Sequence, residues 1–218
     1  VQNDDVINIV SEVDRRLNPG LYEATEVPVT TGAIQTISNA HTLHNAVASL
    51  NPVTVATDGS VHRSYAGGSW GWVADNGEFG YGVLKSADGS LICELSGVEG
   101  MLRSIKASNP LIVLVDSKIA LRLIDNPDSM KDSSAVSSSC RAIARRIKKK
   151  VLDDTERSRP ITFRWVKAHN GDVLNEGADR LARNARLASS FSTTGDMTES
   201  IAKNIADETV ALHKGLRP

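Results

Sequence analysis

The chain has 218 residues, of which 40% are hydrophobic and 23% charged, and its formal net charge is -1. This length is enough for one well-buried domain with appendages, or for two small domains. The composition excludes a polycation, so the net charge of the whole chain does not attract nucleic acid. Any binding of a polyanion must therefore depend on a local basic patch.

Cysteine usage and hydropathy narrow the class of protein further. Cys93 and Cys140 are too few for a disulfide framework and lack metal-ligand spacing, so we expect buried thiols in a reducing compartment. No apolar run approaches the roughly 20 residues that span a bilayer, and we recognise no signal peptide. We expect a cytoplasmic protein that does not enter membranes.

The chain divides into three predicted parts, 1–52, 53–188 and 189–218. In the first part, apolar residues from Val6 to Leu17 share one helical face, and Asn18-Pro19-Gly20 ends that predicted helix. A less regular helical pattern runs from Ile34 to Leu50. The pattern predicts a partly helical extension and indicates no role for it.

The second part predicts a mixed α/β domain. A β-branched strand at 53–57 runs into Asp58-Gly59-Ser60, and two strands at 69–74 and 79–85 flank a turn. A helix at 96–108, a continuous apolar strand at 111–115 and a helix at 117–125 follow. The last elements are a basic helix at 140–152, a strand at 161–166 and a helix at 175–187. This order predicts a mixed sheet, in which the first three strands form a meander and helical crossovers join the later ones.

The third part predicts a linker at 189–196 and then a helix. Ile201, Ile205 and Leu212 form its apolar pattern.

Four carboxylates form the candidate site. Asp58 and Asp116 follow strands, and the carboxyl edge of an open α/β sheet is where ligands bind. Asp116 alone could equally cap the next helix. Glu94 stands just before the helix predicted at 96, and Asp179 lies in the first turns of the last helix of the second part, so each alone is an ordinary acid. Together, carboxylates without Cys or His ligands suit Mg²⁺ or Mn²⁺. Two such ions about 4 Å apart can activate a water and stabilise a leaving oxygen.

Five short blocks, in this order, resemble the ribonuclease H family. They are Thr57-Asp58-Gly59-Ser60, Cys93-Glu94-Leu95, Val115-Asp116-Ser117, Trp165-Val166-Lys167-Ala168-His169 and Asn175-Glu176-Gly177-Ala178-Asp179-Arg180-Leu181-Ala182. No block is diagnostic alone, but their order across residues 53–188 is specific. The resemblance implies the α/β ribonuclease H-like fold of type 1 members, with a mixed five-stranded sheet of three antiparallel and two parallel strands and helices on both faces.

The resemblance also implies the site residues and the reaction. Asp58, Glu94, Asp116 and Asp179 match the family's metal-binding acids, which would hold two Mg²⁺ or Mn²⁺ ions. His169 matches a histidine on a mobile loop that helps product leave or shuttles a proton, with a purely structural histidine as the alternative. The expected reaction is endonucleolytic hydrolysis of the RNA strand of an RNA–DNA hybrid by a monomeric catalytic domain, leaving 5'-phosphate and 3'-hydroxyl ends. The alternatives are another nuclease of this fold, of resolvase or integrase type, and a non-catalytic nucleic-acid-binding module.

Substrate contacts are less well defined, because the chain departs from the family's pattern there. Asp88-Gly89-Ser90 stands where cellular members often carry an Asn- and Thr-rich segment, and the basic protrusion of some bacterial members has no counterpart. The basic helix at 140–152 is either a phosphate-binding surface or a solvated face. The candidate nucleic-acid contacts are Ser60, Lys118, Arg145, Arg146, Lys148 and Lys149.

Overall fold

The structure is a computed structural model that describes residues 6–7, 51–61, 67–131, 133–157, 159–191 and 193–216. The helix expected from Val6 to Leu17 is wrong at its start, where Val6–Ile7 form a short strand, β1. The rest of that helix, and the second one predicted up to Leu50, lie outside the described residues.

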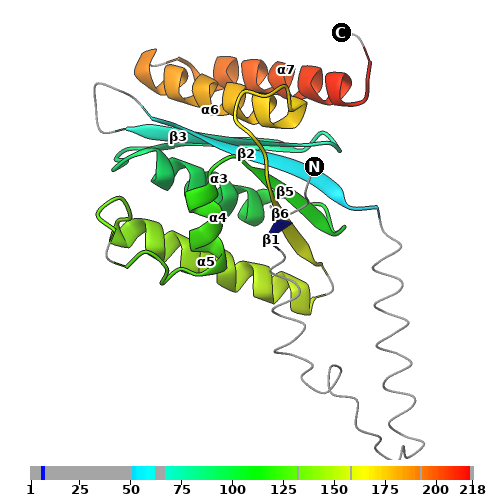
Figure 1. The fold of residues 1–218 in the computed structure, drawn as a ribbon. Coiled ribbons are helices and arrows are strands. Elements are labelled where there is room, and N and C mark those ends of the chain that lie inside the picture. Colours follow the sequence, from blue (N-terminus) through cyan, green and yellow to red (C-terminus); the bar gives the residue numbers. More distant parts are fainter. Residues whose placement is uncertain are drawn as a thin grey trace, which may run out of the picture.

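The strands form one mixed sheet in the order β1-β6-β5-β2-β3-β4 (Figure 1). Strands β2 (Val53–Val61), β3 (Gly68–Ala74) and β4 (Phe79–Leu84) make an antiparallel meander. On the other side of β2, strands β5 (Leu111–Val115) and β6 (Ile161–Trp165) pair in parallel. The predicted five-stranded sheet is confirmed. Strand β1 adds a sixth strand by pairing antiparallel with β6.

Helices cover both faces of this sheet (Figure 1). Helices α3 (Ser90–Ser104), α4 (Lys118–Asp125) and α5 (Ser138–Glu156) lie on one face, and α6 (Val173–Phe191) and α7 (Gly195–His213) on the other. Because strand side chains alternate between faces, Val55 enters the core under α3–α5 while its neighbour Ala56 enters the core under α6 and α7. Among the described residues, no helix is long and apolar enough to cross a membrane.

Helix α7 packs closely along α6. A Cβ on Gly177 would lie 2.4 Å from Cγ2 of Thr209, so the glycine allows the two helices to approach. Arg180 pairs with Glu208 at 2.5 Å across the same contact. The helix predicted around Ile201 is confirmed. The linker predicted at 189–196 is too long, because α6 continues to Phe191 and α7 begins at Gly195.

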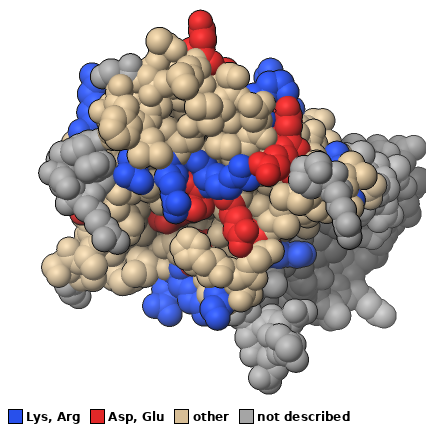
Figure 2. Space-filling model, turned by 90° about the horizontal axis from the view of Figure 1, so that it is seen from above, with Lys and Arg blue, Asp and Glu red and all other residues tan. Residues whose placement is uncertain are grey.

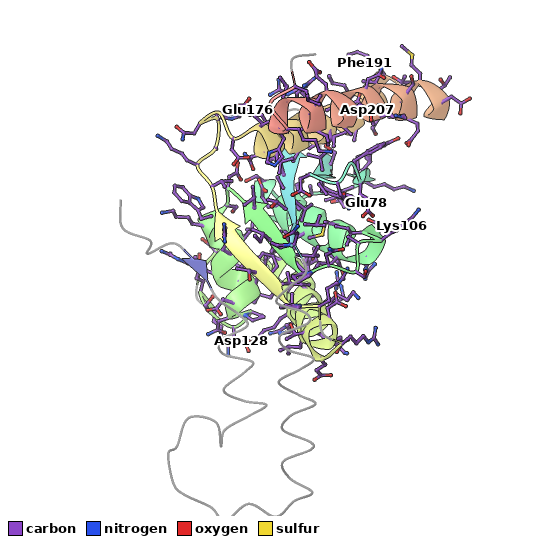
Figure 3. All side chains as sticks on the ribbon, turned by 90° about the vertical axis from the view of Figure 1, so that its right-hand side faces the viewer. Glu78, Lys106, Asp128, Glu176, Phe191 and Asp207 are labelled. Carbon is purple, nitrogen blue, oxygen red and sulfur yellow. The ribbon has the colours of Figure 1, made fainter. Side chains whose placement is uncertain are left out.

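The side chain of Glu78 connects the turn between β3 and β4 to the loop after α3 (Figure 3). Glu78, in the turn between β3 and β4, accepts hydrogen bonds from the backbone N–H groups of Lys106 at 2.6 Å and Ala107 at 3.1 Å. The carboxylate thereby satisfies backbone donors just beyond the end of α3. The meander and α3 are thus held together on the side away from the carboxyl ends of the parallel strands.

Candidate active site

Asp58 lies inside strand β2, whereas the sequence placed it at the strand's end. Strand β2 pairs with β5 only as far as Thr57 opposite Val115, and beyond that point it pairs with β3 alone. The carboxylate of Asp58 therefore stands where the neighbouring parallel strand has ended. It is 7% exposed and accepts a hydrogen bond from Gly59 N at 2.6 Å.

Glu94 reaches Asp58 from helix α3. The helix begins at Ser90, so Glu94 lies in its second turn, and the expectation that it precedes the helix is wrong. The backbone of α3 lies against β2 at Gly59, where a Cβ would be 2.5 Å from Glu94 N. Any other residue at position 59 would push the helix away, and the glutamate with it.

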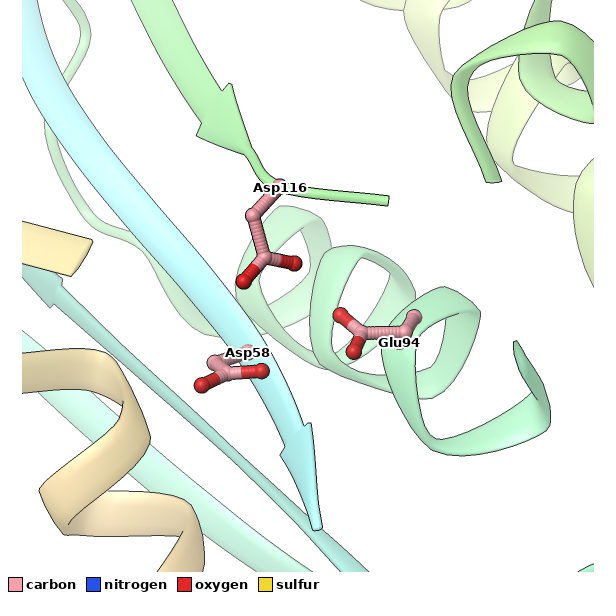
Figure 4. A group of neighbouring side chains, drawn as sticks. All are labelled: Asp58, Glu94 and Asp116. Atoms are coloured by element: carbon pink, nitrogen blue, oxygen red, sulfur yellow. The ribbon is translucent and has the colours of Figure 1, made fainter. Parts of the chain in front are cut away.

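Asp116 completes the group from the end of β5. Ser117, not Asp116, caps helix α4, because its side chain accepts a hydrogen bond from Ala120 N at 3.2 Å. This excludes the capping interpretation of Asp116. Its backbone carbonyl accepts a hydrogen bond from Trp165 Nε1 at 2.9 Å, which links the ends of β5 and β6. Oxygens of Asp58, Glu94 and Asp116 all lie within 4.8 Å of one another (Figure 4).

The carboxylates raise one another's pKa values. Burial, followed by the charges of Asp116 and Asp179, raises the pKa of Asp58 to about 7. Burial and the charges of Asp58 and Asp116 raise the pKa of Glu94 well above its usual range. Burial also raises the pKa of Asp116, against the effect of a hydrogen bond from Asn175. Such a group is unstable when fully ionised unless a cation neutralises it.

The donor set fits a divalent cation. Glu94 Oε2 is buried and has no hydrogen-bond partner among the described residues, although a buried carboxylate oxygen normally has one. Clustered carboxylate oxygens are the ligands that Mg²⁺ and Mn²⁺ prefer.

Asp179 and His169 stand beside this group of three. Asp179 lies on α6, close enough for its charge to raise the pKa values of Asp58 and Asp116, and it pairs with Arg183 Nη2 at 3.3 Å. His169 is exposed on the loop before α6, at a φ of 50°, and its charge lowers the pKa of Asp116. The exposure argues against a buried structural histidine. The structure thus gathers three of the predicted acids tightly and places the fourth acid and the histidine next to them.

Asn175 is a site residue that the sequence analysis did not single out. It is 3% exposed, and its side chain hydrogen-bonds Asp116 and lowers the pKa of that carboxyl group. Asp172 fixes the start of this helix by accepting a hydrogen bond from Asn175 N at 3.0 Å. Position 175 belongs to the last family-like block, but an asparagine in a first helical turn carries no catalytic signal by itself.

The predicted nucleic-acid contacts lie in separate places. Ser60 is on β2 beside the acids, and its hydroxyl accepts a hydrogen bond from Arg186 Nε at 3.0 Å. Lys118 Nζ lies 4.0 Å from the ring centre of Trp165, at the start of α4. The four remaining residues, here called the α5 cations, are Arg145, Arg146, Lys148 and Lys149.

Each of the α5 cations contacts an acceptor in its own chain. Arg145 pairs with Asp128 at 2.8 Å, Arg146 with Glu99 at 2.6 Å, and Lys149 with Asp153 at 2.8 Å, while Lys148 donates to Asp125 O at 2.5 Å. Substrate phosphates would have to compete with these acceptors. The role of the α5 cations in binding nucleic acid remains a prediction.

The comparisons with known proteins agree with this geometry. The family model described as RNase H matches residues 50–186. The chain is 30% identical over 145 residues to a protein named Ribonuclease H from Tropheryma whipplei (strain Twist), a match that covers 66% of this chain and 88% of that protein. It is 31% identical over 140 residues to Ribonuclease HI from Streptomyces coelicolor, covering 61% of this chain and 60% of that protein. A match to Ribonuclease H from Maricaulis maris, at 25% identity over 140 residues, covers 62% of this chain and 93% of that protein. The chain belongs to the ribonuclease H family.

Proposed function

We propose that this protein is a metal-dependent endonuclease that hydrolyses the RNA strand of RNA–DNA hybrids, leaving 5'-phosphate and 3'-hydroxyl ends. The observation that carries the proposal is the group of three carboxylates whose oxygens lie within 4.8 Å of one another, in a chain of the ribonuclease H family. The relatives' names, Ribonuclease H and Ribonuclease HI, support the same activity.

Asp58, Glu94, Asp116 and Asp179 would hold two Mg²⁺ or Mn²⁺ ions. When bound, such a pair of ions supplies an activated water and stabilises the oxygen that leaves phosphorus. The acids lie on β2, on α3, directly after β5 and on α6, so the relative positions of four packed elements set the arrangement of ligands. Rigid positioning of this kind is what in-line displacement at phosphorus requires.

The remaining site residues tune this group. The hydrogen bond from Asn175 lowers the pKa of Asp116 against the effect of burial, which favours the ionised form that a metal ligand needs. His169, which is exposed and close to Asp116, would exchange a proton with the departing product. Recognition of the hybrid would rest on 2'-hydroxyl groups and duplex shape, so base sequence should matter little.

The test is cleavage of an end-labelled RNA–DNA hybrid, with double-stranded RNA, double-stranded DNA and branched DNA alongside. We expect cutting of the RNA strand that requires Mg²⁺ or Mn²⁺, stops with EDTA and yields 5' ends that a phosphatase can dephosphorylate. Asp116→Asn should abolish cleavage, since loss of one ligand removes several kcal/mol of metal-assisted catalysis. Asp207→Asn is the matched control, because Asp207 lies on α7 and its carboxylate pairs with exposed Lys203 at 2.5 Å.

Three outcomes would contradict the proposal. Activity of Asp116→Asn within about tenfold of wild type would refute the metal-site assignment. Binding of the hybrid without cleavage in any divalent metal would favour a non-catalytic module. Preferred cleavage of branched DNA would favour a nuclease of the resolvase type.

A further inference from the structure

Helix α6 carries two arginines on the same face as Asp179. Asp179, Arg183 and Arg186 are spaced i, i+4 and i+7, which places them in one row along a helix. Arg183 Nη2 lies 3.3 Å from Asp179 Oδ2, and Arg186 Nε lies 3.0 Å from Ser60 Oγ. The row therefore begins at the acidic group and extends roughly 10 Å along α6.

Strand β2 brings the far end of this row back to the site. Asp58 and Ser60 are two residues apart on the strand, so their side chains leave the same face, roughly 7 Å from each other. Arg186, which is hydrogen-bonded to Ser60, therefore lies at the position two strand residues beyond Asp58. On the face shown in Figure 2, basic side chains lie in a row beside a group of acidic ones.

The ion pair of Arg183 is one that substrate and metal can open. The Arg183 side chain is 57% exposed, and an exposed pair at 3.3 Å contributes little. A cation bound by Asp179 would neutralise the carboxylate and release the guanidinium. The guanidinium group suits a phosphate, which it can bind through two parallel hydrogen bonds.

We propose that Arg183 and Arg186 form a phosphate-binding site for the backbone of the strand that is cut, next to the scissile bond. This inference rests on the proposed function. It assigns substrate affinity to α6, on the sheet face opposite the α5 cations (Figure 1). The ligand is a nucleic-acid phosphodiester, and its base is irrelevant to the contact.

The experiment measures hybrid binding at several salt concentrations in an Asp116→Asn background, so that the substrate survives. Replacing both Arg183 and Arg186 with Gln should weaken binding and flatten the log–log salt slope by roughly 0.7 to 0.9 for each phosphate that the protein no longer neutralises. Arg180→Gln is the matched control, since Arg180 belongs to the same helix but pairs with Glu208 of α7. Arg180→Gln should have the same salt slope as the parent protein, which carries Asp116→Asn alone.

A second measurement separates a phosphate contact from a structural one. A neutral methylphosphonate, moved one linkage at a time along the cut strand, should weaken binding by the parent at a linkage flanking the scissile bond. It should cause no further loss there in the Arg183→Gln, Arg186→Gln double variant. Ser60→Ala, which removes the hydroxyl that holds Arg186 but keeps the charge, should retain the salt slope.

Each contrary result has a distinct meaning. If the parent binds the hybrid, and the double variant binds it with equal affinity and a parallel slope, the phosphate site is refuted while the proposed function stands. A loss of binding in the double variant that is equal at every linkage and every salt concentration would indicate a structural role and also refute the site. If the wild-type protein neither binds nor cuts hybrid, both proposals fail together.

Discussion

Replacing Asp58 with Asn should stabilise the metal-free protein at neutral and alkaline pH, although it removes activity. The pKa of Asp58 is raised to about 7 by burial and by its acidic neighbours. The folded protein therefore binds this proton more tightly than the unfolded chain does. The contribution of Asp58 to the free energy of unfolding is fully present below the ordinary pKa of 3.8, and it is lost as the pH rises through about 7.

The size of the effect follows from the same values. A rise of the pKa from 3.8 to about 7 corresponds to about 4 kcal/mol of lost stability above pH 7. Asparagine avoids this loss and can keep the hydrogen bond from Gly59 N, since its amide oxygen occupies the place of Oδ1. The gain is at most about 4 kcal/mol, because the buried NH₂ group of the amide also needs acceptors. At acidic pH the gain should shrink, since Asp58 is then protonated in the folded protein.

Urea unfolding in EDTA at pH 5 and pH 8 measures this directly. We expect Asp58→Asn to be more stable than wild type at pH 8, and the difference to be smaller at pH 5. Added Mg²⁺ should then stabilise wild type more than the variant, because ligand binding to the folded state adds to stability. The free energy of unfolding of Asp207→Asn, a control at an exposed residue, should differ little from that of wild type at either pH. An Asp58→Asn protein that gains no stability at pH 8, or gains equally at both values, would refute the reasoning.

Three further predictions concern the loop, the basic helix and the helix pair. His169→Ala should slow turnover without abolishing it, since the carboxylates are intact; complete loss in a folded variant would contradict the assigned role. If the α5 cations contact phosphates, replacing all four with Gln should weaken hybrid binding and flatten its salt dependence, with little change in maximal rate. Salt titrations of binding that are unchanged would instead identify a solvated helix face. Gly177→Ala should lower the melting temperature, because its Cβ would lie 2.4 Å from Thr209 Cγ2, and Thr209→Ala should recover part of the loss. Equal melting temperatures of Gly177→Ala and wild type would show that the two helices can separate freely.

Much of the fold could be predicted from hydrophobic patterns. The apolar run Leu111–Val115 is confirmed as strand β5 to the residue, because a strand covered on both faces has an uninterrupted apolar sequence. The start of α3 was missed, since its N-cap is Gly89 with no side-chain hydrogen bond and Ser90 carries no other start signal. Strand β2 was predicted too short, because Gly59-Ser60 is typical of a turn, and only the packing of α3 on Gly59 explains a glycine within a strand.

The site was predictable in its acids but not in their supporting contacts. The order of the carboxylates along the sequence predicts the candidate metal ligands, because metal-assisted chemistry requires negative oxygens whatever surrounds them. The role of Asn175 depends on a hydrogen bond to Asp116, and that of Arg186 on Ser60, 126 residues away. Contacts between such distant positions depend on how the sheet and α6 pack, which no local pattern specifies.

Helix α7 begins beyond residue 186, where the family match ends, yet it completes a core. Ala202, Ile205 and Ala206 pack with Leu181 of α6 and Val73 of β3. A protein trimmed to the matched residues would expose that apolar surface to water, at a cost of about 25 cal/mol for each Å² uncovered. The helix that carries Asp179 would lose its outer support at the same time. For this chain, the smallest unit that should stay soluble and hold the fourth acid in place is therefore larger than the region that the family model matches.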